Sequence, residues 1–299
     1  MNKKVLLLYF TQSGQLKEIL DHFSEPFDCP DILIETVRIT PKKAYDFPWK
    51  LDAFFDTMPE SVLGIPTPLN EFNFKESKYD LIVVAYQPWF LSPSIPITSL
   101  LIHDDFRKIA QNTPVITLIG SRNMWICAQE KVKKMLQEAG AILVGNIALS
   151  DKNHNVISVV TILYWMRTGK RDNYLGIFPK PGVSELDVNK SKMYGTIAKM
   201  KLLKNDWSLL QPELVTLGAI LIRPNLMFIE SRASKIFTIW ANFTINKKNR
   251  AFRLRILKYY LFIALFIVAP IILLINNIIF RPFIKAQITK KKFYYSGLR

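Results

Sequence analysis

Apolar runs and helical patterns alternate along the first half of the chain. Five runs rich in Val, Ile and Leu predict β-strands, and the first and third are apolar throughout, which is typical of a strand buried on both faces of a parallel sheet. Segments with helical spacing lie between them, one of them from about Ile97 to Gln111. This alternation predicts a doubly wound α/β fold with right-handed crossovers. The predicted strands are Val5–Phe10, Ile32–Ile39, Leu81–Tyr86, Val115–Gly120 and Ala141–Leu149.

A small polar loop follows the first predicted strand and leads into a helix. It reads Thr11-Gln12-Ser13-Gly14-Gln15-Leu16. Hydroxyls and free backbone N–H groups at the positive end of a helix can hold a phosphate without a metal. Neither the G-x-x-x-x-G-K-[ST] motif of P-loop sites nor the G-x-G-x-x-G motif of Rossmann sites occurs here. The loop therefore predicts either a phosphate cradle of another kind or an ordinary turn with a polar helix cap.

A resemblance to a known phosphate-binding loop supports the first of these interpretations. Thr11-x-Ser13-Gly14 resembles the FMN-phosphate loop of flavodoxin-like proteins, T-x-[TS]-G-x-[TS]. The resemblance implies a flavodoxin-like five-stranded parallel sheet and bound FMN. Leu16 stands where the last hydroxyl of the motif usually falls, so that contact either comes from a backbone N–H or is lost.

Three further loops are expected at the same edge of the sheet, because doubly wound sheets bind ligands beyond the carboxyl ends of their strands. They are Gln87–Ser94, Ser121–Trp125 and Ser150–Asn155. Aromatic side chains on two of these loops would offer flat faces to a flavin ring, although such residues are also common in cores. The predicted cofactor-binding residues are Thr11, Gln12, Ser13, Gly14, Gln15, Leu16, Gln87, Pro88, Trp89, Phe90, Gly120, Ser121, Arg122, Asn123 and Trp125.

Arg122, Asp151 and His154 are the candidate catalytic residues at this edge. A flavin carries the redox step itself, so the protein has to hold the ring, stack the substrate and supply a group for proton transfer. Histidine suits proton transfer near neutrality, but a solvated loop histidine is the other interpretation of His154. Cys29 and Cys127 lie far apart without metal-ligand spacing, which indicates reduced thiols and no metal site.

An unusual segment, residues 41–76, separates the second and third predicted strands. It contains Phe47-Pro48-Trp49 and Phe54-Phe55. The segment is too aromatic for a disordered linker and too interrupted by proline for one long helix. We expect either an ordered insertion that packs over a site or a partner, or a surface flap with a small core of its own.

The net charge of +16 is concentrated towards the C-terminus. From Ser231 onward there are 14 Lys and Arg and no Asp or Glu, whereas residues 1–230 carry 26 basic and 24 acidic residues. The basic residues flank hydrophobic runs, which favours an anionic membrane surface over nucleic acid. Tyr259–Phe280 is 22 residues without a charge and is long enough to span a bilayer. A re-entrant segment is the alternative interpretation, because Pro270 and the pair Asn276 and Asn277 could bend the helix.

The chain divides into three expected parts. Residues 1–182 form the flavodoxin-like domain, 183–246 a helical extension, and 247–299 a membrane segment with a basic tail. The extension includes an apolar stripe over Ile229–Phe243, which predicts an amphipathic helix that lies in a membrane interface or docks on the domain. The first apolar run is too short for a signal peptide, so we expect the protein at the cytoplasmic face of the inner membrane, anchored by residues 259–280.

Five stretches carry a wider resemblance: Tyr9–Leu16, Phe54–Leu63, Tyr86–Pro96, Arg122–Trp125 and Gly176–Gly182. Together they resemble a family of bacterial proteins described as dialkylresorcinol condensing enzymes, which accompany flexirubin-type pigment biosynthesis in Bacteroidetes. The Gln-Pro-Trp-Phe-Leu-Ser-Pro-Ser string within them is the most specific part. The resemblance covers about residues 3–280.

The function that this resemblance implies is aromatisation, because the same pathway has a separate ketosynthase-type partner that forms the carbon–carbon bonds. A lipophilic 2,5-dialkylcyclohexane-1,3-dione would be oxidised to a 2,5-dialkylresorcinol by an FMN-dependent oxidoreductase in contact with membrane lipid. Two alternatives stay open. One is a membrane-tethered electron carrier. Such carriers usually have an acidic docking surface, so the near-neutral charge of residues 1–230 argues against it. The other is a flavin-free scaffold that holds the ketosynthase through residues 41–76.

Overall fold

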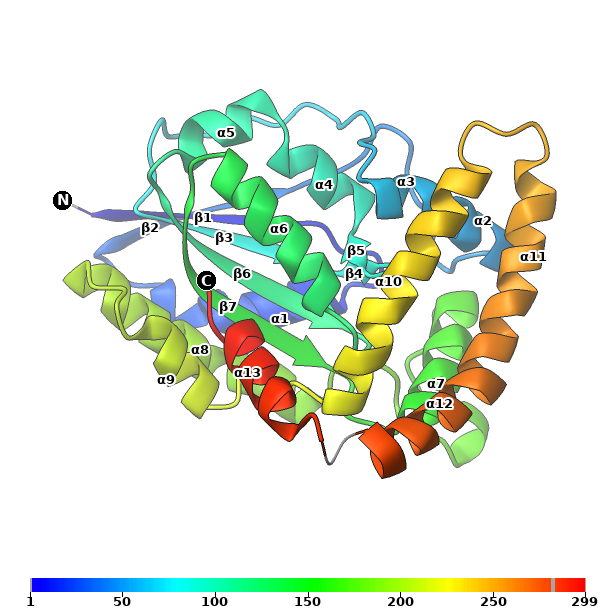
Figure 1. Ribbon diagram of the computed structural model, residues 1–299. Helices are drawn as coiled ribbons and strands as arrows, with labels where there is room; N and C mark the ends of the chain where they lie inside the picture. Colours follow the sequence, from blue (N-terminus) through cyan, green and yellow to red (C-terminus); the bar gives the residue numbers. More distant parts are fainter. Residues whose placement is uncertain (1, 281–282, 299) are drawn as a thin grey trace.

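A computed structural model describes residues 2–280 and 283–298, with the backbone alone for Phe280. Its centre is a five-stranded parallel sheet in the order β2-β1-β3-β6-β7 (Figure 1). The strand order reverses between β1 and β3, which is the switch point of a flavodoxin-like sheet. The expected flavodoxin-like α/β fold is therefore confirmed. The strands are β1 (Lys3–Tyr9), β2 (Ile32–Arg38), β3 (Leu81–Tyr86), β6 (Pro114–Ser121) and β7 (Ile142–Ser150).

Helices cover both faces of this sheet (Figure 1). Successive side chains of β1 alternate between two cores: Val5 and Leu7 pack on one face, Leu6 and Leu8 on the other. Both faces are buried, as the continuous apolar run predicts. The first core includes α1 (Gln15–Ser24), α8 (Glu185–Lys204) and α9 (Leu210–Thr216); the second includes α4 (Ile95–Leu101), α5 (Asp104–Ala110) and α6 (Ile126–Glu138).

The single helix expected from Ile97 to Gln111 is wrong, because α4 and α5 are separate helices. His103 caps α5: its Nδ1 accepts a hydrogen bond from the backbone N–H of Asp105 at 3.3 Å. Asp104 and Asp105 occupy the first turn, where the helix dipole favours negative charge. A cap inside an otherwise helical apolar pattern starts a new helix and changes its direction.

The helices α1 and α8 cross at very close range. The Ser191 hydroxyl of α8 donates to the carbonyl of Ile19 in α1 at 3.1 Å. A Cβ atom added to Gly195 would lie only 1.8 Å from the carbonyl oxygen of Phe23. Glycine at this crossing therefore lets the two backbones touch, and α8 fixes the position of α1.

A row of buried polar side chains crosses the sheet, and we name it the buried polar row. Tyr86 Oη donates to Gln129 Oε1 at 2.8 Å, and Gln129 Nε2 donates to Thr117 Oγ1 at 3.0 Å. Thr117 Oγ1 donates to Asn146 Oδ1 at 3.0 Å. The backbone N–H of Asn146 donates to Gln211 Oε1 at 2.7 Å. Because buried polar groups are costly unless they are paired, this row ties β3, β6 and β7 to α6 and α9.

The insertion 41–76 is ordered and contains α2 (Leu51–Asp56) and α3 (Met58–Leu63). These helices share a small core with the C-terminal helices α10 (Pro224–Thr244) and α11 (Arg250–Ile263), which run side by side in opposite directions (Figure 1). The helices α10 and α11 therefore pack on the insertion. The residues of this core are Phe55, Met58, Val62, Ala241, Leu254 and Leu257.

The helix that begins with α11 continues through further apolar turns to Ile279, and we call Arg250–Ile279 the apolar segment. Among the described residues it is the one helix long and apolar enough to cross a membrane, with a mean hydropathy of 2.7 over an 18-residue window. The remaining elements are η1 (Glu25–Phe27), β4 (Pro88–Trp89), β5 (Ser92–Pro93), α7 (Asn155–Thr168), η2 (Tyr174–Gly176), η3 (Ala264–Val268), α12 (Ala269–Ile275), η4 (Asn276–Phe280) and α13 (Lys285–Ser296).

Candidate functional site

A cavity of about 430 Å³ lies at the carboxyl edge of the sheet, where β1, β3 and β6 end. Its size is typical of a small-molecule site. The end of β6, the loops after the three strands and the start of α1 supply its polar lining: Gln12, Ser13, Gln15, Gln87, Ser121, Arg122 and Asn123. Four helical regions supply its apolar wall, which includes Phe54 of α2, Ile162 and Leu163 of α7, Ala233 and Phe237 of α10, and Leu261, Leu265 and Ala269 of the apolar segment.

The loop after β1 has the geometry of an anion cradle. Gly14 adopts φ +91°, a left-handed conformation that favours glycine, and its N–H donates to Thr11 Oγ1 at 3.1 Å. Within the described part of the chain, the backbone N–H groups of Ser13, Gln15 and Leu16 have no hydrogen-bond acceptor. They lie at the N-terminus of α1, where free N–H groups and the helix dipole favour an anion. The loop therefore fits a phosphate, and Leu16 contributes only its backbone.

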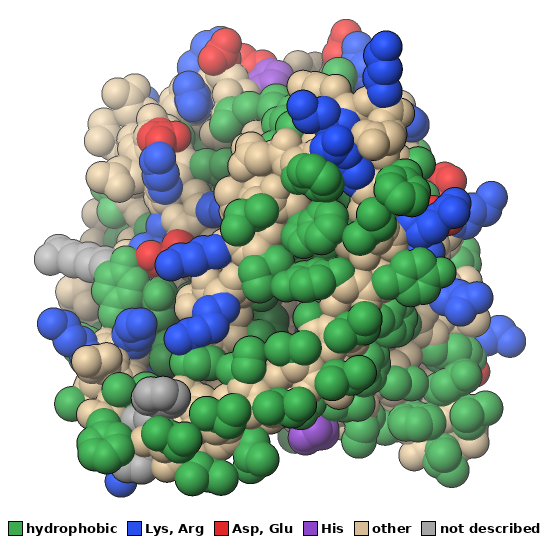
Figure 2. Space-filling model, turned by 45° about the vertical axis from the view of Figure 1, so that its right-hand side comes forward, with side chains coloured by type: hydrophobic (Ala, Val, Ile, Leu, Met, Phe, Trp, Pro, Cys, Tyr) green, Lys and Arg blue, Asp and Glu red, His purple; other side chains and the backbone are tan. Residues whose placement is uncertain are grey.

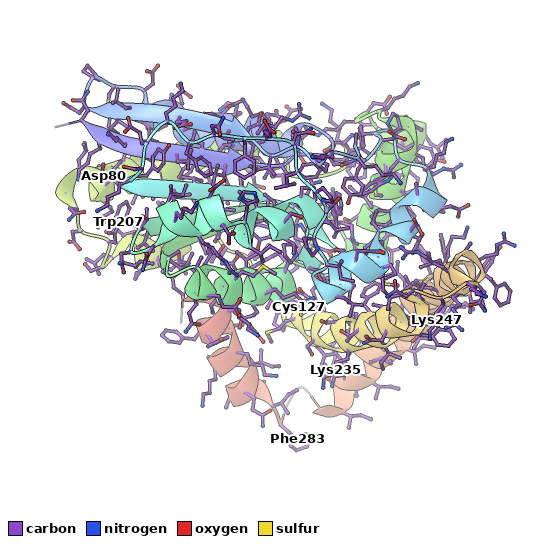
Figure 3. The ribbon with its side chains drawn as sticks, turned by 90° about the horizontal axis from the view of Figure 1, so that it is seen from above. Asp80, Cys127, Trp207, Lys235, Lys247 and Phe283 are labelled. Atoms are coloured by element: carbon purple, nitrogen blue, oxygen red, sulfur yellow. The ribbon has the colours of Figure 1, made fainter. Side chains whose placement is uncertain are left out.

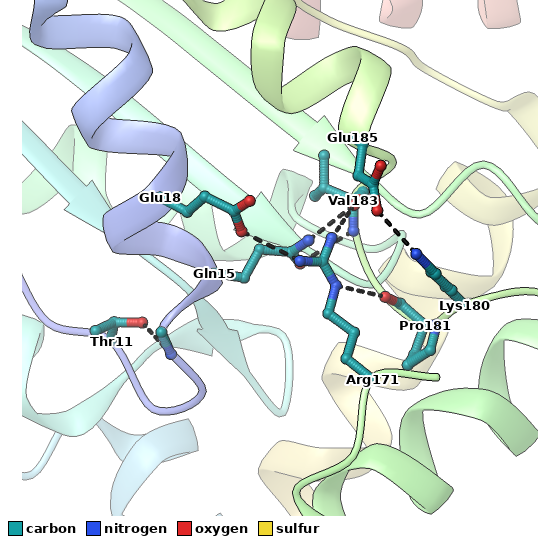
Figure 4. Close-up of polar contacts among 9 residues, drawn as sticks. Thr11, Gln15, Glu18, Arg171, Lys180, Pro181, Val183 and Glu185 are labelled. Atoms are coloured by element: carbon teal, nitrogen blue, oxygen red, sulfur yellow. Dashed lines mark hydrogen bonds and ion pairs between the residues drawn. The ribbon is translucent and has the colours of Figure 1, made fainter. Parts of the chain in front are cut away.

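A strap formed by residues 171–183 closes over the first turn of α1 (Figure 4). Gln15 Nε2 donates to the carbonyl of Val183 at 2.7 Å, and the Val183 N–H donates back to Gln15 Oε1 at 3.0 Å. Arg171 pairs with Glu18 at 3.1 Å and also donates to the Val183 carbonyl at 2.8 Å. The Gln15 side chain thus holds the strap, which leaves its backbone N–H as the group available to a cofactor.

Gly182 in this strap gives a testable consequence. Its φ is +86°, and an added Cβ would lie 2.4 Å from Gln15 Oε1 and 2.8 Å from the Trp165 ring. Gly176 is the matched control, because its φ is +71° but no atom of the described residues lies within 4 Å of an added Cβ. Both alanine variants carry backbone strain, so we expect Gly182→Ala to lose about 2 kcal/mol more than Gly176→Ala in urea unfolding. Equal losses would mean that the strap does not press on Gln15.

The hairpin of β4 and β5 borders the same cavity in a strained conformation. Phe90 and Leu91 have φ values of +47° and +61°, which cost bulky residues about 1 kcal/mol or more each. The Trp89 carbonyl accepts from Ser61 Oγ at 2.9 Å. The Gln87 amide, in the orientation that satisfies both neighbours, accepts from Gln12 N and Trp89 Nε1 at 3.2 Å each. The insertion and the loop after β1 therefore hold this hairpin in place.

Two of the three aromatic residues expected around a flavin line the cavity. Trp89 is buried in a cluster with Phe10 and Trp49, at ring-centroid distances of 5.7 and 4.9 Å, and part of it faces the cavity. Phe90 stacks on Phe54 at 4.5 Å and also lines it. Trp125 is only 2% exposed and lies in the core, outside the lining. The structure thus does not bring Trp125 to this cavity.

Of the three candidate catalytic residues, the structure brings one to the cavity. Arg122 donates to Asn155 Oδ1 at 2.9 Å and is the one ionisable side chain among the described residues of the lining. Burial lowers the pKa of Arg122 to about 10, against the opposing charge of Asp151, so Arg122 stays cationic at neutral pH. Asp151 is 1% exposed and outside the lining, and His154 is exposed before α7 and makes no capping bond.

The apolar wall is the part of the site that the sequence analysis missed. Ile229, Ala233 and Phe237 lie on the stripe predicted for an amphipathic helix, and all three face the cavity. Of the two interpretations left open, docking on the domain therefore describes α10 in this structure. The apolar stripe could have indicated that α10 packs on another surface, but its sequence does not determine which surface that is.

Comparisons with known proteins give flavoproteins among solved structures. A flavoprotein in complex with FMN from Lactobacillus acidophilus NCFM is 20% identical, covers 48% of this chain and 91% of its own, and has a TM-score of 0.40. A putative flavoprotein from Bacteroides uniformis is 16% identical, with coverages of 56% and 100% and a TM-score of 0.39. A flavodoxin from the domain Archaea is 11% identical, with coverages of 67% and 99% and a TM-score of 0.38. Neither a protein-family model nor a curated protein matches the chain.

Proposed function

We propose that the protein is an FMN-dependent oxidoreductase with its cofactor phosphate on the loop Thr11–Leu16. The observation that carries the proposal is one cavity with an anion cradle at its polar end and an apolar wall at the other. Ser13 and Gly14 supply the turn, and the hairpin residues Trp89 and Phe90 supply faces for the ring. When bound, FMN would accept the hydride that oxidation of the substrate releases.

The proposed substrate is a 2,5-dialkylcyclohexane-1,3-dione, which loses a hydride and a proton to become a 2,5-dialkylresorcinol. The helical wall supports this choice, because two alkyl chains need apolar surface beside the ring. A 1,3-dione ionises readily to an enolate. The Arg122 guanidinium would hold that oxygen, since it is the cation that reaches the cavity. An electron carrier needs no apolar chamber beside its flavin, so the wall favours an enzyme over a carrier.

The proposed setting is the cytoplasmic face of the inner membrane. A ketosynthase-type condensing enzyme would make the dione, since the described lining residues of this cavity include no cysteine that could carry an acyl chain for forming carbon–carbon bonds. The apolar segment and the basic residues around it support membrane attachment. The lipophilic product and substrate would then exchange with the bilayer.

The test is the visible spectrum of the detergent-purified protein, before and after anaerobic addition of a dialkylcyclohexanedione. We expect flavin bands that bleach on addition. Ser13→Asp should weaken FMN binding about 100-fold or more, because a carboxylate in the cradle repels the phosphate. Ser77→Asp is the matched control, in an exposed loop outside the cavity.

Three other outcomes would contradict parts of this proposal. Flavin that binds but stays oxidised with the dione would favour the electron carrier. A colourless protein that takes up no added FMN would favour the third hypothesis, a flavin-free scaffold. Equal FMN affinity in the Ser13 and Ser77 variants would show that the loop after β1 does not bind the FMN phosphate.

A further inference from the structure

The start of the apolar segment is bound to the insertion. The Arg250 guanidinium donates to the carboxylates of Asp56 and Glu60 at 2.6 to 2.7 Å. Two turns further on, Lys258 Nζ lies 3.0 Å from the Asp52 carboxylate. Between these ion pairs, the side chain of Leu257 is fully buried. The first turns of the segment therefore belong to the folded domain.

The chain beyond the apolar segment is bound to the same domain. Tyr294 Oη of α13 donates to Glu130 Oε2 of α6 at 2.8 Å, and Lys133 Nζ lies 4.7 Å from the centre of the Tyr294 ring. Near the end of α13, the carbonyl of Ser296 accepts from Gln211 Nε2 at 2.8 Å. Gln211 of α9 belongs to the buried polar row, so this bond ties the end of α13 to the elements around β7, the edge strand of the sheet.

These two anchors restrict where the apolar segment can go. The five residue steps from Phe280 to Lys285 reach about 18 Å at most, even fully extended. The hydrocarbon core of a bilayer is about 30 Å thick. The end of the segment therefore cannot lie across a bilayer from the domain while α13 remains docked on α6.

We propose that the apolar segment lies in the plane of one membrane leaflet and does not cross the bilayer. The two anchors place residues 247 and 290 on the same side of the membrane as the sheet. The exposed face of the segment would then contact a single leaflet of an anionic bilayer. This inference rests on the membrane attachment proposed above and replaces the span with a monotopic geometry.

The exposed side chains of the segment form one stripe suited to that leaflet. They recur every three or four residues, which is the spacing of one helix face. On the opposite side, Leu261, Leu265 and Ala269 line the cavity, and Ala269 is the last residue of the segment in that lining. Figure 2 shows apolar side chains gathered across this face of the molecule. The stripe contains Ile263, Ile267, Ile271, Leu274 and Ile278, each between 53% and 66% exposed.

The charges around the stripe fit an anionic surface. Lys247 and Lys248 precede the segment, Lys285 and Lys290 follow it, and no acidic residue occurs from Ser231 onward. Figure 2 shows basic side chains at the margins of the apolar face, and Figure 3 shows Phe283 pointing away from the domain. Basic residues at the rim of an apolar face are attracted to anionic headgroups while the apolar side chains enter the leaflet.

The test maps three introduced cysteines in the full-length protein in inverted inner-membrane vesicles. Lys247→Cys and Lys290→Cys flank the segment, and Lys78→Cys marks the far side of the domain; all three positions are exposed. A membrane-impermeant maleimide is added and the labelled peptides are identified by mass spectrometry. We expect all three introduced thiols to react in intact vesicles, with less than a twofold gain on adding detergent.

Two results would overturn the proposal, for different reasons. If the thiol introduced at position 247 reacts but the one at position 290 needs detergent, the segment spans the bilayer and the docking of α13 is lost in the membrane. If the protein stays in the supernatant, the proposed membrane attachment itself is wrong. The FMN spectrum of the same preparation is read separately, so the oxidoreductase proposal is judged independently of either result.

Discussion

Replacing Gly195 with alanine is expected to lower the free energy of unfolding by about 3 kcal/mol or more. Alanine in the middle of a helix normally stabilises it by about 0.5 to 1 kcal/mol relative to glycine. Here the new methyl group would lie 1.8 Å from the Phe23 carbonyl oxygen, which is backbone and cannot rotate away. The helices α1 and α8 would have to separate, and the cradle at the N-terminus of α1 would move with them.

Urea unfolding followed by circular dichroism in non-ionic detergent measures this effect. Thr196→Ala is the matched control, because Thr196 is the next residue of α8 and faces solvent. We expect the control to change stability by less than about 0.5 kcal/mol. A Gly195→Ala protein as stable as the wild type would show that the two helices do not cross this closely.

The second large effect is a pH dependence of stability that arises from Glu230. This residue of α10 is 1% exposed, and its Oε1 accepts from the backbone N–H of Cys127 at the start of α6, at 2.7 Å. Burial raises the pKa of Glu230 to about 7 from its ordinary 4.5, with the α6 hydrogen bonds acting against the rise. The Cys127 thiol facing it has its own pKa raised to about 12 by burial, so it stays neutral. Lys291 and Tyr295 of α13 line the cavity of about 370 Å³ beside it.

The sign follows from which state binds the proton more tightly. The folded protein holds the Glu230 proton up to about pH 7, whereas the unfolded chain releases it near pH 4.5. Stability should therefore fall as the pH rises from 4.5 to 7, by about 3 kcal/mol in total from this group, and then level off. Glu230→Gln keeps an acceptor for α6 without a charge, so its stability should lack this fall.

Unfolding midpoints measured from pH 5 to 8 test this prediction. The expected result is a wild-type midpoint that drops across the range while that of Glu230→Gln stays nearly flat. Glu138→Gln, near the exposed end of the same α6 helix, is the control and should keep the wild-type slope. Parallel curves for the wild type and Glu230→Gln would rule out Glu230 as the titrating group.

The sequence predicts the sheet well because strand burial is a local property. The third predicted strand, Leu81–Tyr86, has the same bounds as the observed β3, since every residue of that run is buried on one face or the other. The rule that parallel strands end at one edge also places the loop Thr11–Leu16 beside Gln87 and Arg122. The cavity lining contains Gln87, Arg122 and four residues of the loop, but neither Thr11 nor Gly14.

Side-chain direction and long-range docking are beyond such local rules. Trp89 and Trp125 both follow strands, but only Trp89 reaches the cavity, because the strained hairpin turns it back over the edge. The docking of the apolar segment depends on Arg250 meeting acids 190 and 194 residues earlier in the chain. No periodicity within the segment contains that information, so a span and a docked helix look alike in sequence.

The buried polar row also decides between two alignments of β6 and β7. Val115 pairs with Leu143 but Ile116 pairs with Gly145, so Val144 is an extra residue that bulges from β7. In an unbulged alignment, Ile116 would lie opposite Val144 and Thr117 opposite Gly145. The bond from Thr117 to Asn146 is lost in that alternative, leaving buried polar groups without partners. A one-residue slip would also carry the end of β7 about 3.3 Å along the sheet, and Asn155 would no longer meet Arg122.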